Sequence, residues 1–79
     1  MEQTVHLLRR DLSRNMARFY RLELCRTLFG ELVLIRRWGR IGTTGQQSEI
    51  IVLDRGDGEV ALSRWARRKL ARGYHIDDR

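Results

Sequence analysis

The sequence predicts an α+β domain: an antiparallel sheet of about four strands with one amphipathic helix packed across it. Two observations carry this prediction. Apolar side chains alternate with a period of two over residues 17–27 and 31–38, which is typical of half-buried strands. From about Glu59 onward the apolar spacing becomes helical. Strands that come first and one helix that follows them favour an α+β fold, in which the helix covers one face of the sheet.

Four segments are expected as strands because they alternate or are rich in β-branched residues: 4–10, 17–27, 31–38 and 48–53. Gly30 is the turn residue between the second and the third, so these two should form a hairpin. In the third segment, Leu34 and Trp38 should share one side, opposite Val33 and Ile35. The run DRGDG at 54–58 is expected as a second turn.

The helix should present Leu62, Trp65 and Leu70 to the sheet. Its other side is basic, with Arg64, Arg67, Arg68, Lys69 and Arg72, and should either face solvent or extend a nucleic-acid footprint. Gly73 is placed to end the helix. The tail, YHIDDR at 74–79 with 76–79 beyond the domain core, is expected to be only partly ordered.

The chain is short and strongly basic. Its 79 residues predict one domain, and a chain of this size buries only about 60% of its unfolded surface. Sixteen basic residues against ten acidic ones give a net charge of +6, and Lys69 is the only lysine. Arginine grips phosphate in a bidentate manner, so nucleic acid is the leading class of partner, with a merely solubilising charged face as the alternative.

Other classes find little support. No stretch approaches the ~20 apolar residues of a membrane span, and the N-terminus does not resemble a signal peptide, so we expect a cytoplasmic protein without membrane contact. Cys25, His6 and His75 lack the spacing of a zinc site. With no catalytic constellation and no nucleotide-binding loop, we expect neither an enzyme nor a bound cofactor.

The segment RRWGRIGTTGQQ at 36–47 is the candidate site. Trp38 is either a core residue or a platform on which a base or sugar stacks. Arg40 lies close to Gly39 and Gly42, which leave room for a phosphate to approach backbone N–H groups. One of Arg36 and Arg37 should share the side of Trp38, and the pattern does not decide which. Further candidate contacts are the side chains of Gln46, Arg64 and Arg68.

These residues resemble the WGR domain family. Trp38-Gly39-Arg40 followed by Ile41-Gly42 matches its central signature, and Gly45-Gln46 is similar to the continuation. Two further blocks at matching spacing are Arg18-Phe19-Tyr20 upstream and Arg72-Gly73-Tyr74 downstream. The resemblance covers roughly residues 15–75 and indicates one domain over 1–79 with its core at about 15–75. The blocks Asn15 to Tyr20 and Leu28-Phe29-Gly30 resemble the bacterial stand-alone branch.

The resemblance implies a compact, twisted antiparallel sheet with one helix across it. In eukaryotic poly(ADP-ribose) polymerases, the family's domain binds DNA at strand breaks. There the motif tryptophan packs against a sugar at the broken end, and the motif arginine works near the terminal phosphate and at a contact between domains. Carried over, these positions are Trp38 and Arg40, and only the DNA-contacting half of the role transfers to a chain without a catalytic domain.

We therefore expect a small nucleic-acid-binding module, for DNA ahead of RNA, with little sequence specificity and with ends or nicks as candidate targets. The alternative is a non-catalytic adaptor that docks a protein partner through the same Trp38 and Arg40 surface, because tryptophan and arginine are enriched at interface hot spots. The exposed strand edges leave a monomer and a weak homodimer both open.

Overall fold

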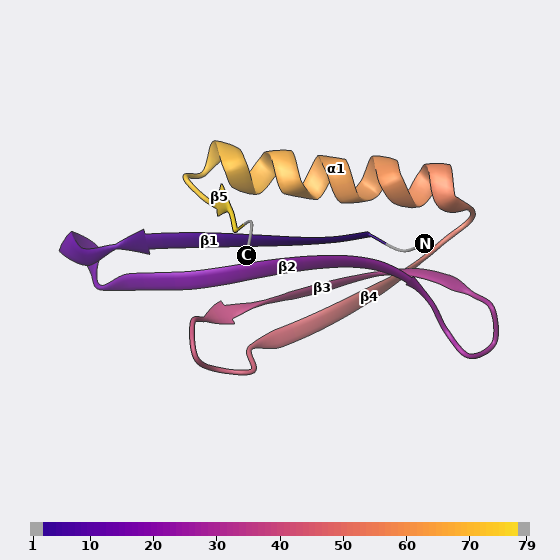
Figure 1. Cartoon of the computed structure of the whole chain (residues 1–79), viewed down its shortest axis with the longest axis horizontal. Coiled ribbons are helices and arrows are strands. Elements are labelled where there is room, and N and C mark those ends of the chain that lie inside the picture. Colours follow the sequence, from indigo (N-terminus) through magenta and orange to yellow (C-terminus); the bar gives the residue numbers. More distant parts are fainter. Residues whose placement is uncertain (1–2, 78–79) are drawn as a thin grey trace.

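The computed structural model describes residues 3–77, which form one five-stranded antiparallel sheet and one helix that crosses it (Figure 1). The elements, in chain order, are β1 (Gln3–Asp11), the short 3-10 helix η1 (Leu12–Arg14), β2 (Met16–Arg26), β3 (Leu32–Arg40), β4 (Gln46–Val52), α1 (Arg55–Ala71) and β5 (His75–Ile76). The strand order across the sheet is β4-β3-β2-β1-β5. The α+β prediction is confirmed, with five strands in place of about four.

The fifth strand comes from the segment that was expected as a tail. His75 and Ile76 pair with Leu8 and Leu7 of β1, and the backbone N–H of Asp77 donates to the carbonyl of His6 at 2.8 Å. β5 thereby shields a short part of the free edge of β1. Residues 78–79 of the expected tail lie outside the described residues.

The alternation in β2 and β3 sets the two faces of the sheet. Tyr20, Leu22 and Leu24 pair directly with Trp38, Arg36 and Leu34, and all of these side chains point toward α1. The core between sheet and helix is built from buried residues of β1, β2, β3 and α1: Leu7, Tyr20, Leu22, Leu24, Leu32, Leu34 and Leu62. Its fully buried Leu7 belongs to β1, so the packed interior includes residues ahead of position 15.

The expected turn at 54–58 is wrong, because α1 already begins at Arg55. Asp54 caps the helix: its carboxylate accepts the backbone N–H of Asp57 at 2.8 Å. The glycines of DRGDG suggested a turn, yet Gly58 has a packing role inside the helix. A Cβ added there would lie 2.6 Å from Leu24 Cδ1, so glycine lets the helix approach the sheet closely.

The helix does not turn Leu70 toward the sheet, which corrects a second expectation. Leu62 is buried and Trp65 packs against the core, as predicted, but Leu70 is 39% exposed. The inner stripe continues from Trp65 to Lys69, four residues later, and position 70 is rotated away by about 100°. The predicted solvent-facing positions of Arg64, Arg67, Arg68 and Arg72 are confirmed.

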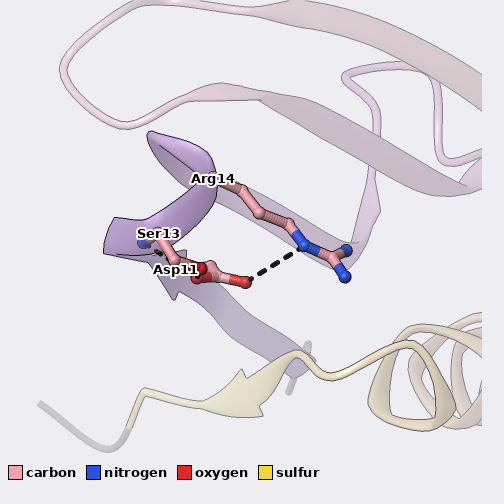
Figure 2. A network of polar contacts seen from close by, with 3 residues as sticks. All are labelled: Asp11, Ser13 and Arg14. Carbon is pink, nitrogen blue, oxygen red and sulfur yellow. Dashed lines mark hydrogen bonds and ion pairs between the residues drawn. The ribbon is translucent and has the colours of Figure 1, made fainter.

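The connection from β1 to β2 is a tight, self-contained turn (Figure 2). Asp11 caps η1 and accepts hydrogen bonds from the backbone N–H of Ser13 at 3.1 Å and from its hydroxyl at 2.6 Å. The hydroxyl bond lowers the pKa of Asp11 below its ordinary value. Arg14 lies 3.6 Å from the same carboxylate, and Asn15 takes the left-handed conformation that lets the chain enter β2.

Candidate nucleic-acid interface

The WGR tripeptide forms the last three residues of β3, beside the C-terminal half of α1. Two glycines shape the loop that follows it. A Cβ on Gly39 would lie 2.8 Å from the Cα of Gly45, and Gly45 itself has a φ of +72° and sits against the Trp38 carbonyl. Gly42 also has a positive φ, of +94°. Close backbone approach at Gly39 and Gly45 and a positive φ at Gly42 and Gly45 explain the three glycines.

A pocket of about 380 Å³ opens at this end of the molecule, on the helix side of the sheet. Trp38, Gly39 and Arg40 of β3 form one wall. The remaining lining comes from Arg18 of β2, Lys69 of α1 and Tyr74 between α1 and β5. Two aromatic rings and three cationic side chains therefore line one small space, and no carboxylate lies among its described lining.

The positive charges around this pocket repel one another. Arg18 and Arg40 are direct cross-strand partners, and like charges in that position are unfavourable for the sheet. Arg40 donates to the backbone carbonyl of Asn15 at 3.3 Å, which holds its guanidinium at the pocket. Burial lowers the pKa of Lys69 below its ordinary value, and the positive charges of Arg72, Arg36, Arg18 and Arg68 lower it further. An anion in this pocket would relieve the repulsion between these groups.

Trp38 lies partly in the core and partly at the pocket. It packs against the core, with its ring centre 6.4 Å from that of Tyr20 in a stacked arrangement, and it also lines the pocket. Tyr74 meets Tyr20 edge to face at 6.4 Å between ring centres, and Lys69 Nζ lies 4.6 Å from the Tyr20 ring centre. Tyr20 thus contacts both aromatic residues of the pocket lining, Trp38 and Tyr74, and holds them in place.

The structure decides which arginine joins Trp38. Arg36 lies on the helix side, where its guanidinium stands over the rings of both Trp38 and Trp65 and donates to the Tyr20 hydroxyl at 3.3 Å. Arg37 lies on the opposite face, where it hydrogen-bonds the side-chain oxygen of Gln47.

The remaining candidates lie outside the pocket. Gln46 pairs with Trp38 across β3 and β4, on the same side of the sheet, and is exposed beyond the pocket lining. Arg64 is exposed on α1, and Arg68 covers the outer side of the Trp65 ring at 4.6 Å. Both lie along the helix that leads to Lys69.

Two lining residues, Arg18 and Tyr74, were not among the sequence candidates, and Lys69 was expected on the basic side of the helix and not in the pocket. Arg18 could have been found from the alternation of β2, because it shares a side with Tyr20. Lys69 falls four residues after Trp65 and therefore on the inner stripe of the helix. Tyr74 follows the helix-ending Gly73, and only the fold shows that it returns to the sheet.

Two other properties of residues 3–77 bear on function. No helix among them is both long enough and apolar enough to cross a membrane. Within the same range, no three histidine, cysteine, aspartate or glutamate side chains gather in a way that could hold a metal ion.

Comparison with known proteins identifies the family. The model of the WGR domain matches residues 3–79. The chain is 45% identical over 69 residues to the uncharacterized protein y4dW of Sinorhizobium fredii, an alignment that covers 84% of this chain and 32% of that protein. The chain thus spans about a third of that relative's length. No solved structure matches. The match over nearly the whole chain, together with the WGR tripeptide at the mouth of a basic pocket, shows that this protein belongs to the WGR domain family.

Proposed function

We propose that this domain is a non-catalytic module that binds nucleic acid, DNA in the first place, in the pocket formed by Trp38, Arg40, Arg18, Lys69 and Tyr74. The observation that carries the proposal is the composition of this pocket: three cations and two aromatic rings without a carboxylate in the described lining. Cationic side chains bind phosphate, and aromatic rings stack on sugars or bases, so this set of side chains is suited to a nucleotide. The WGR family is a nucleic-acid-binding module family, which supports the same conclusion.

In the proposed mode of binding, the cationic side chains bind the phosphate and the aromatic ring of Trp38 binds the sugar or base. Arg18 and Arg40 face each other across β2 and β3, and a phosphate between them accepts hydrogen bonds from both guanidinium groups. Lys69 adds a third positive charge from the helix. The adjacent sugar or base then lies against Trp38, whose ring is fixed by its contact with Tyr20.

This arrangement favours a strand end over the middle of a duplex. A pocket lined from three elements accepts a group that projects into it, whereas an internal phosphate of a duplex is flanked on both sides by the continuing backbone. Contacts to phosphate and sugar position the ligand without reading sequence. We therefore propose ends or nicks as the preferred target and little sequence specificity.

The test is a set of single charge removals measured by fluorescence anisotropy on a 5′-phosphorylated nicked duplex, with a matching RNA as a second ligand. Arg18→Gln, Arg40→Gln and Lys69→Gln should each weaken binding and reduce the slope of log affinity against log salt, by at most the ~0.9 that one neutralised phosphate contributes. Arg64→Gln and Arg67→Gln remove the same charge from exposed helix positions and serve as matched controls.

Equal losses from pocket and control variants would mean that the net charge alone attracts the ligand, and would reject the pocket as the site. Absence of nucleic-acid binding above that of any protein with a charge of +6 would instead favour the protein-adaptor alternative.

A further inference from the structure

The turn between β2 and β3 displays two large apolar side chains at the end of the molecule. Leu28 and Phe29 are 101% and 91% exposed. We call residues 27–31 the tip. Figure 1 shows it extending at the end where α1 begins, away from the loop at 41–45. A neighbouring pair of almost fully exposed apolar side chains is a feature of binding surfaces.

The tip is held in one conformation by its own hydrogen bonds. The Thr27 hydroxyl accepts the backbone N–H groups of Phe29 at 3.2 Å and Glu31 at 3.3 Å. Backbone bonds join Thr27 to Glu31 at 2.8 Å and Gly30 to Thr27 at 3.1 Å, and Arg26 donates to the Gly30 carbonyl at 2.9 Å. A turn fixed in this way presents Leu28 and Phe29 with little further loss of entropy on binding.

The end of the molecule that carries the tip is acidic, in contrast to the rest of the chain. The segments 26–31 and 53–60, which both lie toward this end (Figure 1), carry four carboxylates and two arginines. Leu53 and Val60 in the second segment are also exposed, at 92% and 57%. This chemistry disfavours nucleic acid and anionic lipid, and it is complementary to an apolar pocket with a basic rim.

Such a pocket exists on the face of the sheet that α1 leaves uncovered. It has a volume of about 400 Å³ and lies apart from the tip, beside the loop at 41–45. Leu8, Phe19 and Ile41 supply its apolar lining. Its polar lining comes from Arg21, Arg37, His6, Thr43 and Thr44.

The two arginines of this pocket lie next to each other, and Arg21 has a donor without a hydrogen-bond partner in the part of the chain that the structure describes. Arg21 and Arg37 are direct cross-strand partners, which is unfavourable for two like charges. Glu23 lies 3.4 Å from Arg21, but the buried Nε of Arg21 has no hydrogen-bond partner among the described residues.

We propose that the tip of one copy docks into this open-face pocket of a second copy. Phe29 packs against the apolar lining, and Glu31 approaches Arg21 and Arg37. Tip and pocket are different surfaces that lie apart along a molecule that is 44 Å long, so the contact is head-to-tail and can be repeated from copy to copy. The contact is small and therefore weak for free protein, and it strengthens when a common ligand brings copies close together.

The test is self-association in the absence of nucleic acid, measured by sedimentation velocity up to millimolar concentration. The outcome is therefore independent of the proposed nucleic-acid function. Phe29→Asp disables the tip, and Arg37→Glu disables the pocket. We expect the unmodified chain to associate at high concentration, and each variant alone to stay monomeric there. An equimolar mixture of the two variants should form dimers and nothing larger, because each dimer retains one disabled tip and one disabled pocket.

Leu12→Asp is the matched control for the tip. Leu12 is 97% exposed in η1, between β1 and β2, so its substitution should leave association unchanged. Circular dichroism checks that each variant is folded. A chain that stays monomeric at every concentration would overturn the proposal, and so would a mixture of the two variants that fails to dimerise. Association that survives both substitutions would also overturn it and would locate the contact elsewhere, for example at the free edge of β4.

Discussion

The guanidinium carbon of Arg36 lies 4.1 Å from the centre of the Trp65 ring, so a strand residue and a helix residue are joined by a cation–π contact. The same guanidinium stands 5.2 Å from the ring centre of Trp38. The guanidinium carbon of Arg68 also lies 4.6 Å from the centre of the Trp65 ring. Arg36 thus contacts an indole of the pocket lining and an indole of α1, and it connects the two.

We predict that Arg36→Lys destabilises the domain by about 1–2 kcal/mol. An ammonium keeps the charge but loses the planar stacking on the two indoles and the hydrogen bond to the Tyr20 hydroxyl. Urea unfolding followed by tryptophan fluorescence measures the change. Arg64→Lys, at an exposed helix position, is the control and should leave the midpoint unchanged. Equal midpoints for the two variants would show that the stack does not stabilise the fold.

Gly58→Ala should destabilise the domain, although alanine is the better helix former. Its Cβ would lie 2.6 Å from Leu24 Cδ1 and 3.3 Å from Val52 Cγ2, and Leu24 is fully buried. We expect a cost of about 1–3 kcal/mol from overpacking, larger than the ~1 kcal/mol gained in helix propensity. Gly56→Ala is the matched control, because its Cβ would meet only Asp54 Oδ1, at 3.4 Å. In thermal denaturation, Gly56→Ala should have a higher melting temperature than Gly58→Ala. The reverse order would contradict the close packing of Gly58 against Leu24.

The pKa of Lys69 should rise when an anion binds. In the free protein, burial and the neighbouring arginines hold it below the ordinary value of 10.5. A base whose pKa is lowered by folding destabilises the fold while it is charged, so stability should increase as pH rises through the folded pKa toward 10.5. A bound phosphate reverses the local field and favours the ammonium form.

This titration can be followed at a single site, because Lys69 is the only lysine. The ¹³Cε resonance of labelled lysine should titrate at higher pH when a 5′-phosphorylated oligonucleotide is present. The same oligonucleotide without its terminal phosphate is the comparison ligand. An identical titration curve with and without ligand would place the anion away from Lys69.

Arg40→Lys should weaken DNA binding roughly tenfold while the net charge is kept. Lysine cannot form the bidentate contact with phosphate that the guanidinium makes. The slope of affinity against salt should change little, because the number of neutralised phosphates stays the same. Anisotropy titrations at two salt concentrations measure both quantities, with Arg64→Lys as the control. Unchanged affinity would show that Arg40 contributes only its charge.

The fold was largely predictable because alternation and helical spacing are properties of local sequence. The two faces of β2 and β3 follow directly from Tyr20, Leu22 and Leu24 opposite Leu34 and Trp38. The start of α1 was not predictable from composition, because Gly56 and Gly58 resemble a turn, and only the closeness of Leu24 explains the second of them. β5 was missed because a two-residue strand has no periodicity.

The site was predictable only where it coincides with a motif. Trp38, Gly39 and Arg40 are adjacent in sequence and lie together in the pocket. Arg18, Lys69 and Tyr74 come from three other segments, and their meeting depends on the register of β2 with β3 and on the length of α1. The pattern left open which of Arg36 and Arg37 shares the side of Trp38, and it did not indicate that Arg36 packs against the rings of both Trp38 and Trp65.

The most direct test of the proposed nucleic-acid site compares broken with closed DNA. Fluorescence anisotropy would measure binding to a duplex with a 5′-phosphorylated nick and to the same duplex closed by hairpins at both ends. Three proteins are needed: the unmodified domain, Trp38→Ala, and Trp65→Ala, which removes an equally large ring outside the pocket, each confirmed to be folded. We predict that the unmodified domain and Trp65→Ala prefer the nicked duplex and that Trp38→Ala loses this preference. Equal binding of both duplexes by all three proteins, abolished by moderate salt, would contradict the proposed site.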